Sequence, residues 1–242
     1  MIFKIDSKSN SKIKEIVKLT KPSYSKSSGL YIAEGFHLLE MALKENVIDS
    51  IFTTKEIKNV DPIIPQYLVS SDVMEKISLL NSSQGVLFLV RIPKEKEISS
   101  NKVLFLDDVS DPGNLGAIFR SALAFGYNDI ILSKNACYQF NPKVVQASQG
   151  AIFKLNILND DGYYLPRLKS FGYKVVVTYL RDATNIESVG KLDKKVLVLG
   201  NEAHGVSKEI LDKSDKRVRI DINNIESLNV AIAGAIAMYI FR

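Results

Sequence analysis

Val196-Leu-Val-Leu-Gly-Asn-Glu-Ala-His-Gly-Val-Ser207 is an apolar run that gives way at Gly200 to a polar loop. Short, continuous apolar runs of this kind are typical of strands that are buried on both faces of a parallel sheet. Similar runs occur at Val103–Leu106, Ile130–Leu132 and Val175–Val177. Segments with helical character lie between these runs, and strands that alternate with helices indicate a parallel sheet covered on both faces. The second part of the chain is therefore predicted to be α/β.

Four helices are expected around this sheet, at Ala117–Phe125, Lys143–Ser148, Tyr163–Phe171 and Leu228–Phe241. The last segment is apolar and rich in alanine, which is typical of a well-packed helix. Ligands of parallel sheets bind beyond the carboxyl ends of the strands. The loops that follow the apolar runs are therefore the places where a functional site is expected.

Residues 1 to about 91 show a smaller alternation of helices and strands. Helical spacing is present at Lys12–Leu19 and Phe36–Leu43, and the pattern Ser71-Asp-Val-Met-Glu75 predicts a capped helix start. Strands are expected at Leu30–Ala33, Ile48–Thr53 and Gly85–Val90. The polar stretch 93–101 has no apolar periodicity and is interpreted as a linker. The expected domains are therefore 1–92 and 102–242.

The composition fits a globular protein with a polyanionic partner. The 242 residues are 46% hydrophobic, and 32 Lys and Arg against 27 Asp and Glu give a net charge of +5. A basic excess suits nucleic acid. One cysteine excludes an intramolecular disulfide, and with two histidines it makes a structural metal site unexpected. No run reaches the roughly 18 apolar residues of a membrane span, so the expected location is cytoplasmic.

The first candidate site segment is Asp111-Pro-Gly-Asn-Leu-Gly116, which follows the apolar run at Val103–Leu106. Pro and Gly favour a turn there, and Asn114 can bind a backbone group or a ribose hydroxyl. Arg120 lies one helical turn past Gly116, which directs its guanidinium back over the loop. Such an arginine suits a phosphate or a polarised hydroxyl. The alternative is a strand-to-helix turn followed by an ordinary surface arginine.

The second segment is the loop after Leu199. Gly200 allows a ligand to approach the backbone closely. Glu202 is interpreted either as an organiser of a ligand-binding loop or as an acid at a helix N-terminus, where the helix dipole favours it. Neither a Gly-x-Gly-x-x-Gly pattern nor a phosphate-binding Walker loop is present, which argues against a nicotinamide cofactor and against nucleotide hydrolysis.

The third segment runs from Ile220 to Val230 and presents Ser227 and Asn229 just before the last helix. The alternative interpretation makes Ser227 the helix N-cap and places Asn229 in the first turn. No chemical role is assigned to His37, Cys137 or His204.

Taken together, in this order and at this spacing, the three segments resemble the three motifs of the SpoU (TrmH) family of RNA ribose 2′-O-methyltransferases. The resemblance covers about 140 residues, from Leu104 to the C-terminus. The N-terminal stretch Tyr31-Ile-Ala-Glu-Gly-Phe-His-Leu-Leu-Glu-Met-Ala42 is also similar to the substrate-binding domain of this family, which resembles ribosomal protein L30e.

The resemblance implies an L30e-like α/β domain for substrate binding, followed by a SPOUT-type α/β domain with a mostly parallel sheet and a C-terminal trefoil knot. It also implies a homodimer, S-adenosylmethionine as the methyl donor and structured RNA as the substrate. Among RNAs, 23S rRNA is favoured and transfer RNA is the nearer alternative. A non-catalytic RNA-binding factor of ribosome assembly is the alternative from a different functional class.

Carried over position by position, the family pattern assigns the chemistry to Asn114, Arg120, Glu202, Ser227 and Asn229. It assigns cofactor binding to the backbone near Gly200, Ile220 and Leu228. Arginine guanidinium groups have a pKa above about 12 and remain protonated in proteins. We therefore expect Arg120 to position the ribose hydroxyl and to stabilise developing negative charge, rather than to act as a base.

The chain departs from the family pattern in the third motif. Ile220-Asp-Ile222 stands where the family usually has Ile-Pro-Met or Ile-Pro-Leu, and the loop before Ser227 is one residue short. Replacing proline frees a backbone N–H and adds a carboxylate, so cofactor affinity is the property expected to change.

The lysines of Ser7–Lys14 and Lys21–Lys26 are candidates for holding RNA, and the alternative is that they are ordinary solvated surface residues.

Overall fold

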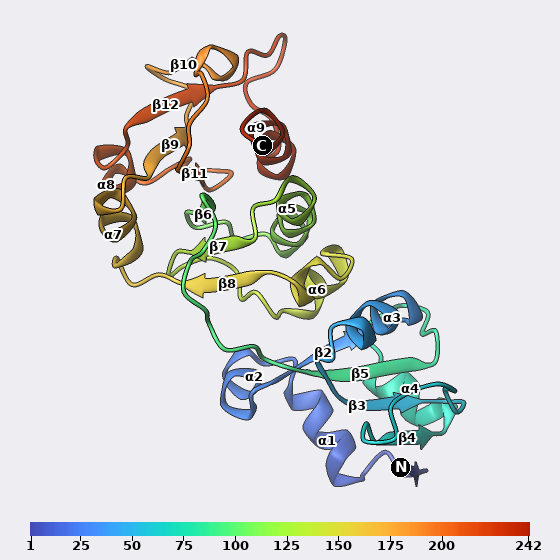
Figure 1. Cartoon of the computed structure of the whole chain (residues 1–242). Helices are drawn as coiled ribbons and strands as arrows, with labels where there is room; N and C mark the ends of the chain where they lie inside the picture. Colours follow the sequence, from blue (N-terminus) through green and yellow to red (C-terminus); the bar gives the residue numbers. More distant parts are fainter. The chain divides into compact units, whose positions relative to one another are not determined.

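The computed structural model describes all 242 residues, and the contacts among them divide the chain into two compact units. Unit 1 comprises Met1–Lys94 together with Tyr138–Phe153, and unit 2 comprises Glu95–Cys137 together with Lys154–Arg242 (Figure 1). The bounds 1–92 and 102–242 expected for the two domains stay a prediction. None of the helices is long and apolar enough to cross a membrane.

Unit 1 is built on a five-stranded mixed sheet. Its strands lie in the order β1 (Ile2–Ile5), β4 (Gln66–Val69), β3 (Ile48–Thr53), β5 (Val86–Arg91) and β2 (Leu30–Glu34). The first three are mutually parallel, and β5 is antiparallel to both of its neighbours. Three of these strands were expected, whereas the pattern did not predict β1 and β4.

Helices cover this sheet and complete the core of unit 1. They are α1 (Ser11–Lys18), α2 (Pro22–Ser28), α3 (Phe36–Lys44), α4 (Ser71–Ile77) and α6 (Pro142–Ala147). The apolar side chains of α1 and α4 form one cluster with Phe52 and Leu87 of the sheet. The ring of Phe140, just before α6, stacks on Tyr31 of β2 with the centroids 4.5 Å apart. The cap of α4 is Ser70 rather than Ser71, because the Ser70 hydroxyl accepts from the Val73 N–H.

The carboxylate of Glu34, at the end of β2, is only 2% exposed and holds the loop that follows α4. It accepts hydrogen bonds from the hydroxyls of Ser78 and Ser83, at 2.6 and 3.0 Å, and from the N–H of Leu79 at 2.7 Å. A buried carboxylate is tolerated when its oxygens are satisfied in this way. Glu34 thus ties the loop 78–85 to the edge strand of the sheet.

We predict that Glu34→Ala lowers the free energy of unfolding by about 2 kcal/mol or more, because three donors lose their shared acceptor. Glu40→Ala is the matched control, since Glu40 is exposed and pairs only with Lys44. Its cost should stay below about 0.5 kcal/mol. Urea unfolding of both variants measures the difference, and equal losses would contradict the role given to Glu34.

Unit 2 contains a seven-stranded sheet in which every pair of neighbours is parallel. The strand order is β10 (Thr184–Asn185), β12 (Lys216–Arg219), β9 (Lys174–Thr178), β11 (Lys195–Leu199), β6 (Lys102–Leu106), β7 (Asp129–Leu132) and β8 (Asn156–Asn159). Strands β6 and β11 lie at the centre, and their apolar side chains are buried. The predicted parallel α/β architecture is confirmed.

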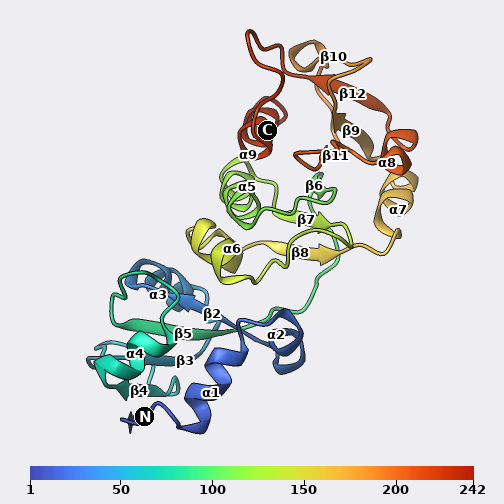
Figure 2. The same ribbon diagram turned by 180° about the vertical axis from the view of Figure 1, so that it is seen from behind.

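Helices cover both faces of this sheet, as expected for a parallel α/β unit. In both views α5 (Pro112–Phe125) and α9 (Val230–Ile240) lie side by side on one face (Figures 1 and 2). On the other face lie α7 (Tyr164–Ser170) and α8 (Lys208–Asp212). Helix α5 begins five residues earlier than expected, because the Asp111 side chain caps it and Pro112 occupies its first position. The trefoil knot stays a prediction.

Candidate functional site

A cavity of about 850 Å³ lies beyond the carboxyl ends of β9, β11 and β12. Most of its wall comes from four chain segments, namely 178–181, 200–205, 218–222 without Asp221, and 226–230, and Ile186 and Ala233 complete it. These three strands are neighbours in the sheet, so the loops that follow them meet at one edge. The volume falls within the range of small-molecule sites in proteins. The second and third candidate segments therefore converge on one cavity.

A chain of three hydrogen-bonded side chains links the first segment to the other two. The Asn229 amide nitrogen donates to the Asn114 amide oxygen at 2.9 Å. In turn, the Asn114 amide nitrogen donates to the Glu202 carboxylate at 2.7 Å. Residues that are 88 and 115 positions apart in sequence are thus brought together. Asn114 is the member of the set that touches both partners.

The first turn of α9 determines how the side-chain amides of Asn229 and Asn114 are oriented. The amide oxygen of Asn229 accepts from the N–H groups of Ala231 and Ile232, so Asn229 is the N-cap of the helix. The amide nitrogen of Asn229 is therefore the group that faces Asn114. It donates a hydrogen bond, and the amide oxygen of Asn114 accepts it. The interpretation of Ser227 as the cap is wrong, because α9 starts two residues later than the sequence pattern indicated.

The loop after β11 is a tight turn closed by two backbone hydrogen bonds between Asn201 and Gly205. Gly200 stands directly against this turn, and a Cβ atom placed there would lie 2.4–2.5 Å from the backbone of Gly205 and Val206. Only glycine fits at this position. Glu202 lies within the turn, six residues before α8 begins, so its interpretation as an acid at a helix N-terminus is wrong.

Two consecutive aspartates directly after β6 support this loop. Asp107 is buried, and its carboxylate accepts from the Ser207 N–H at 2.6 Å. Burial raises the pKa of Asp107, and the hydrogen bonds from Ser207 oppose that rise. Asp108 has a positive φ of 58°, and its carbonyl accepts from the Asn201 amide at 2.8 Å. The Asn201 oxygen then accepts from the next backbone N–H groups of the turn.

The unusual third motif turns its extra carboxylate away from the cavity. Ile220 and Ile222 line the cavity, whereas Asp221 does not. Asp221 accepts from the Asn185 amide at 2.6 Å and from the Arg219 guanidinium at 2.9 Å. Its pKa is lowered, first by the hydrogen bond from Asn185 and then by that from Arg219. Successive side chains of an extended segment point to opposite sides, which explains the separation.

The remaining candidates occupy different places. Ser227 lines the cavity with an exposed side chain, and Leu228 lies beside it. Arg120 lies on α5, nearly two helical turns after Asn114, with an exposed side chain that is not part of the cavity wall. The backbone positions expected to hold a cofactor, near Gly200, Ile220 and Leu228, all line the cavity.

Sequence reasoning missed the contribution of the segment Thr178–Arg181, which forms one wall of the cavity. The Thr178 hydroxyl donates to the carbonyl of Val198 at 3.0 Å, which ties the end of β9 to β11. A signal was present in the sequence, because this segment directly follows the apolar run Val175–Val177. The rule that sites lie at the carboxyl ends of parallel strands applies to β9 as well.

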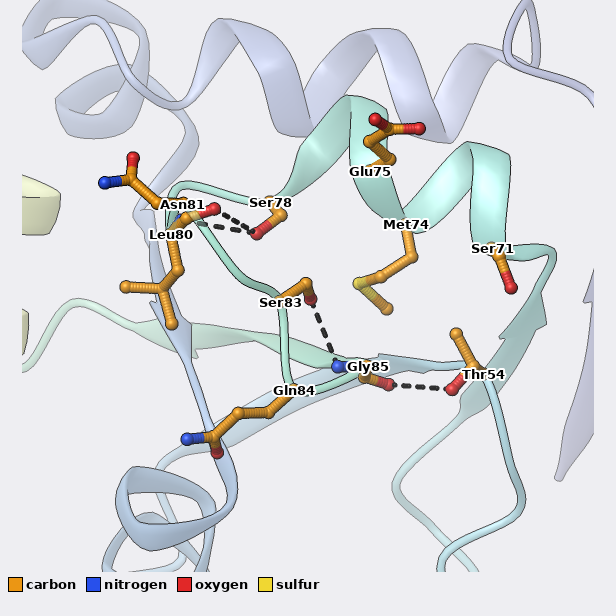
Figure 3. A pocket seen from close by; sticks show the side chains of 10 residues that line it. All are labelled: Thr54, Ser71, Met74, Glu75, Ser78, Leu80, Asn81, Ser83, Gln84 and Gly85. Carbon is orange, nitrogen blue, oxygen red and sulfur yellow. Dashed lines mark hydrogen bonds between the residues drawn. The ribbon is translucent and has the colours of Figure 1, made fainter.

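Unit 1 has a smaller cavity of about 340 Å³ between α4 and the loop 78–85 (Figure 3). Thr54 and Ser83 bracket Gly85 there, with Ser83 accepting from the Gly85 N–H and Thr54 donating to its carbonyl. Glu75 is the only charged residue in the wall. None of the candidate residues from the three segments lies in it, and the structure contains no cluster of His, Cys, Asp or Glu arranged for a metal ion.

Comparison with known proteins agrees with this division into a site-bearing unit and a second α/β unit. The SpoU rRNA Methylase family matches residues 101–239, and the MRM3-like substrate binding domain matches residues 10–87. The first match covers more than half of the chain and includes all three site segments. The chain therefore belongs to the SpoU rRNA Methylase family.

Individual relatives resemble the chain over its whole length. It is 31% identical to the 23S rRNA (guanosine(2553)-2′-O)-methyltransferase RlmP of Bacillus subtilis, over 98% of both chains. An rRNA methyltransferase from Sinorhizobium meliloti has the same fold with a TM-score of 0.90 and 26% identity, over 99% of this chain and 96% of that one. An AdoMet-bound structure from the same organism has a TM-score of 0.89 at 25% identity, over 99% and 97%.

The cavity fits a cofactor such as S-adenosylmethionine by its own geometry. The glycine turn at Gly200 brings backbone to the cavity wall with no side chain in the way. Leu180, Ile220 and Leu228 supply apolar surface for a purine ring, and polar side chains such as Thr178 also belong to the wall. A wall that is about equally polar and apolar can hold the purine on apolar side chains and fix its orientation through the polar ones.

We predict that Gly200→Ala weakens binding of S-adenosylhomocysteine by about tenfold or more, because the new methyl group displaces the Asn201–Gly205 turn. Asp221→Asn is the matched control, since its side chain faces away from the cavity, and its affinity should change less than about threefold. Isothermal titration of both variants measures this. A large loss for Asp221→Asn alone would show that the third motif contacts the cofactor through this residue.

Proposed function

We propose that this protein is an S-adenosylmethionine-dependent methyltransferase that methylates a ribose 2′-hydroxyl in 23S ribosomal RNA. The observation that carries the proposal is the convergence of the second and third segments on one cavity, to which the first segment is joined by the Asn229–Asn114–Glu202 hydrogen bonds. The reaction class is supported by family membership. The 23S target is supported by the relative from Bacillus subtilis, which is similar over the whole chain.

In this proposal the backbone near Gly200, Ile220 and Leu228 holds the cofactor. When bound, S-adenosylmethionine supplies a methyl group on a positively charged sulfur as the electrophile. The chain contributes mainly by holding the ribose hydroxyl in line with that group. Correct alignment of two reactants can by itself supply several kcal/mol of a barrier.

Arg120 is the group we assign to the ribose 2′-oxygen. An arginine guanidinium stays protonated in proteins, so it donates hydrogen bonds and does not accept the hydroxyl proton. Its exposed position on α5 leaves its donors available for RNA. Negative charge that develops on the 2′-oxygen would be stabilised by this fixed positive charge.

We assign different tasks to the linked polar residues. Asn229 has both ends of its amide committed, to α9 and to Asn114, and is therefore a positioning residue. Glu202 is exposed and has a second carboxylate oxygen beyond the one bound to Asn114, so it can accept from a ribose hydroxyl. Ser227 is free to contact either RNA or cofactor from the cavity wall.

We also infer a homodimer that acts in the cytoplasm, where rRNA is modified. The dimer is supported by helix α9, which has no charged residue and leaves Ile232 and Tyr239 more than half exposed. Exposed apolar side chains on a packed helix are typical of contact surfaces. Light scattering of the purified protein gives the mass, and a mass of a single chain at micromolar concentration would refute the dimer.

The first test is methyl transfer from radiolabelled S-adenosylmethionine into unmodified 23S, 16S and transfer RNA. We expect label in 23S rRNA alone, and digestion should release it as a 2′-O-methyl nucleotide. Label in transfer RNA alone would show that transfer RNA, not 23S rRNA, is the substrate. The absence of label with folded protein that binds S-adenosylhomocysteine would favour an RNA-binding factor of ribosome assembly.

A second prediction concerns Arg120. Arg120→Ala should reduce methyl transfer by about 100-fold or more, because the charge that stabilises the 2′-oxygen is lost. The affinity for S-adenosylhomocysteine should stay within about threefold, since Arg120 is not part of the cavity wall. Arg167→Ala on α7 is the control, because Arg167 pairs with Glu97 and lies outside the site. Equal rates for the two variants would contradict the role of Arg120.

A further inference from the structure

Three aromatic rings form a continuous stack across one edge of the sheet of unit 1. Phe3, Tyr67 and Phe52 occupy matching register positions on the adjacent parallel strands β1, β4 and β3. The ring centroids of Phe52 and Tyr67 are 4.8 Å apart with an interplanar angle of 18°. Those of Tyr67 and Phe3 are 5.3 Å apart at 23°. The rings therefore lie nearly parallel, one after another.

The stack leads from the core of unit 1 to its surface. Phe52 is 2% exposed and belongs to the apolar cluster beneath α1 and α4, whereas Phe3 is 45% exposed. Because β1 is the edge strand, no further strand lies beside Phe3. The side of the Phe3 ring that faces away from Tyr67 is thus the free end of the stack. An exposed phenylalanine held in place by a packed neighbour is a preformed stacking surface.

The charge around this end of the chain is strongly positive. Residues 1–26 contain seven lysines against Asp6 and Glu15, which is a net charge of +5. The rest of the chain contains 25 basic and 25 acidic residues and is therefore neutral. The whole positive excess of the protein lies in the segment that forms β1, α1 and α2. Such a concentration of lysines attracts a polyphosphate backbone.

One of these lysines is placed directly at the aromatic stack. The Lys12 ammonium lies 5.0 Å from the centre of the Tyr67 ring, in the first turn of α1. No acidic side chain forms an ion pair with it. Planar rings next to unpaired cations are the combination that proteins use to bind single-stranded nucleic acid, in which bases stack on aromatic side chains. Neither a phosphate alone nor an apolar peptide would use both features.

We propose that Phe3 is a stacking platform for an unpaired base of the substrate RNA, with Lys12, over the neighbouring Tyr67 ring, placed to contact the RNA backbone. This inference rests on the proposed function and deepens it, because it names where unit 1 holds the RNA. Phe3 lies before residue 10, where the match to the MRM3-like substrate binding domain begins. Phe3 itself is thus outside the matched region, whereas Lys12 and Tyr67 lie within it.

The chain contains no tryptophan, so a single introduced tryptophan reports on its own surroundings. We would measure the fluorescence of Phe3→Trp during titration with an oligoadenylate of about twelve nucleotides, within the usual site sizes of single-strand binders. Inorganic polyphosphate of similar charge is the probe without bases. Phe171→Trp is the control, because Phe171 is 57% exposed and lies in unit 2.

We expect oligoadenylate to quench the emission of Phe3→Trp, and polyphosphate to leave it unchanged. The emission of Phe171→Trp should respond to neither probe. Equal quenching of Phe3→Trp by both probes would overturn the proposal, because charge alone would then account for it. Absence of quenching while anisotropy of labelled oligoadenylate shows binding would overturn it as well.

A second arm measures affinity directly. Phe3→Leu keeps an apolar side chain but removes the ring, and it should weaken oligoadenylate binding by about fivefold or more. Phe3→Trp should retain wild-type affinity, and Phe171→Leu should change nothing. Unchanged affinity for Phe3→Leu would overturn the proposal. A change in its mass by light scattering, without loss of affinity, would assign the edge strand to contact with another protein chain. These binding assays need no methyl donor, so their outcome is independent of whether the protein transfers methyl groups.

Discussion

The direction of the hydrogen bonds that start at helix α9 is the constraint on which the site depends. The first turn of α9 takes the amide oxygen of Asn229, which leaves only its nitrogen to face Asn114. Asn114 must then present its own nitrogen to Glu202. A helix N-terminus thus determines, through two amides, that a carboxylate lies at the edge of the cavity. Removal of Asn229, Asn114 or Glu202 would leave the neighbouring side chain without its hydrogen-bond donor or acceptor.

The loop after β11, at the same edge of the sheet, is also fixed by hydrogen bonds to the two residues that follow β6. Asp107 and Asp108 anchor the loop after β11 through Ser207 and Asn201. The positive φ of Asp108 suits aspartate, whose short polar side chain tolerates this conformation better than most residues do. Because β6 and β11 are neighbours at the centre of the sheet, the turn beyond Gly200 is held by the most buried part of the unit.

Strong apolar runs made much of the fold predictable from the sequence. The four buried strands of unit 2 and three strands of unit 1 lie where the pattern indicated, because hydrophobic burial on both faces leaves an unambiguous signal. Strands β1, β4, β8, β10 and β12 were missed. The segment Lys216–Arg219 carries three charges and only one buried side chain, Val218, so it is a strand because β9 and β10 pair with it. Long-range pairing of this kind has no local signature.

The kinds of residue at the site, and their order along the chain, could be inferred from the sequence, because each motif is a contiguous segment with a recognisable turn chemistry. Tertiary structure alone decided how those residues are used. It made Asn229 the helix cap in place of Ser227, turned Asp221 towards Asn185 and Arg219, and aligned Phe3 with Tyr67. Each of these outcomes depends on a partner distant in sequence, and a partner that folding supplies cannot be read from local propensity.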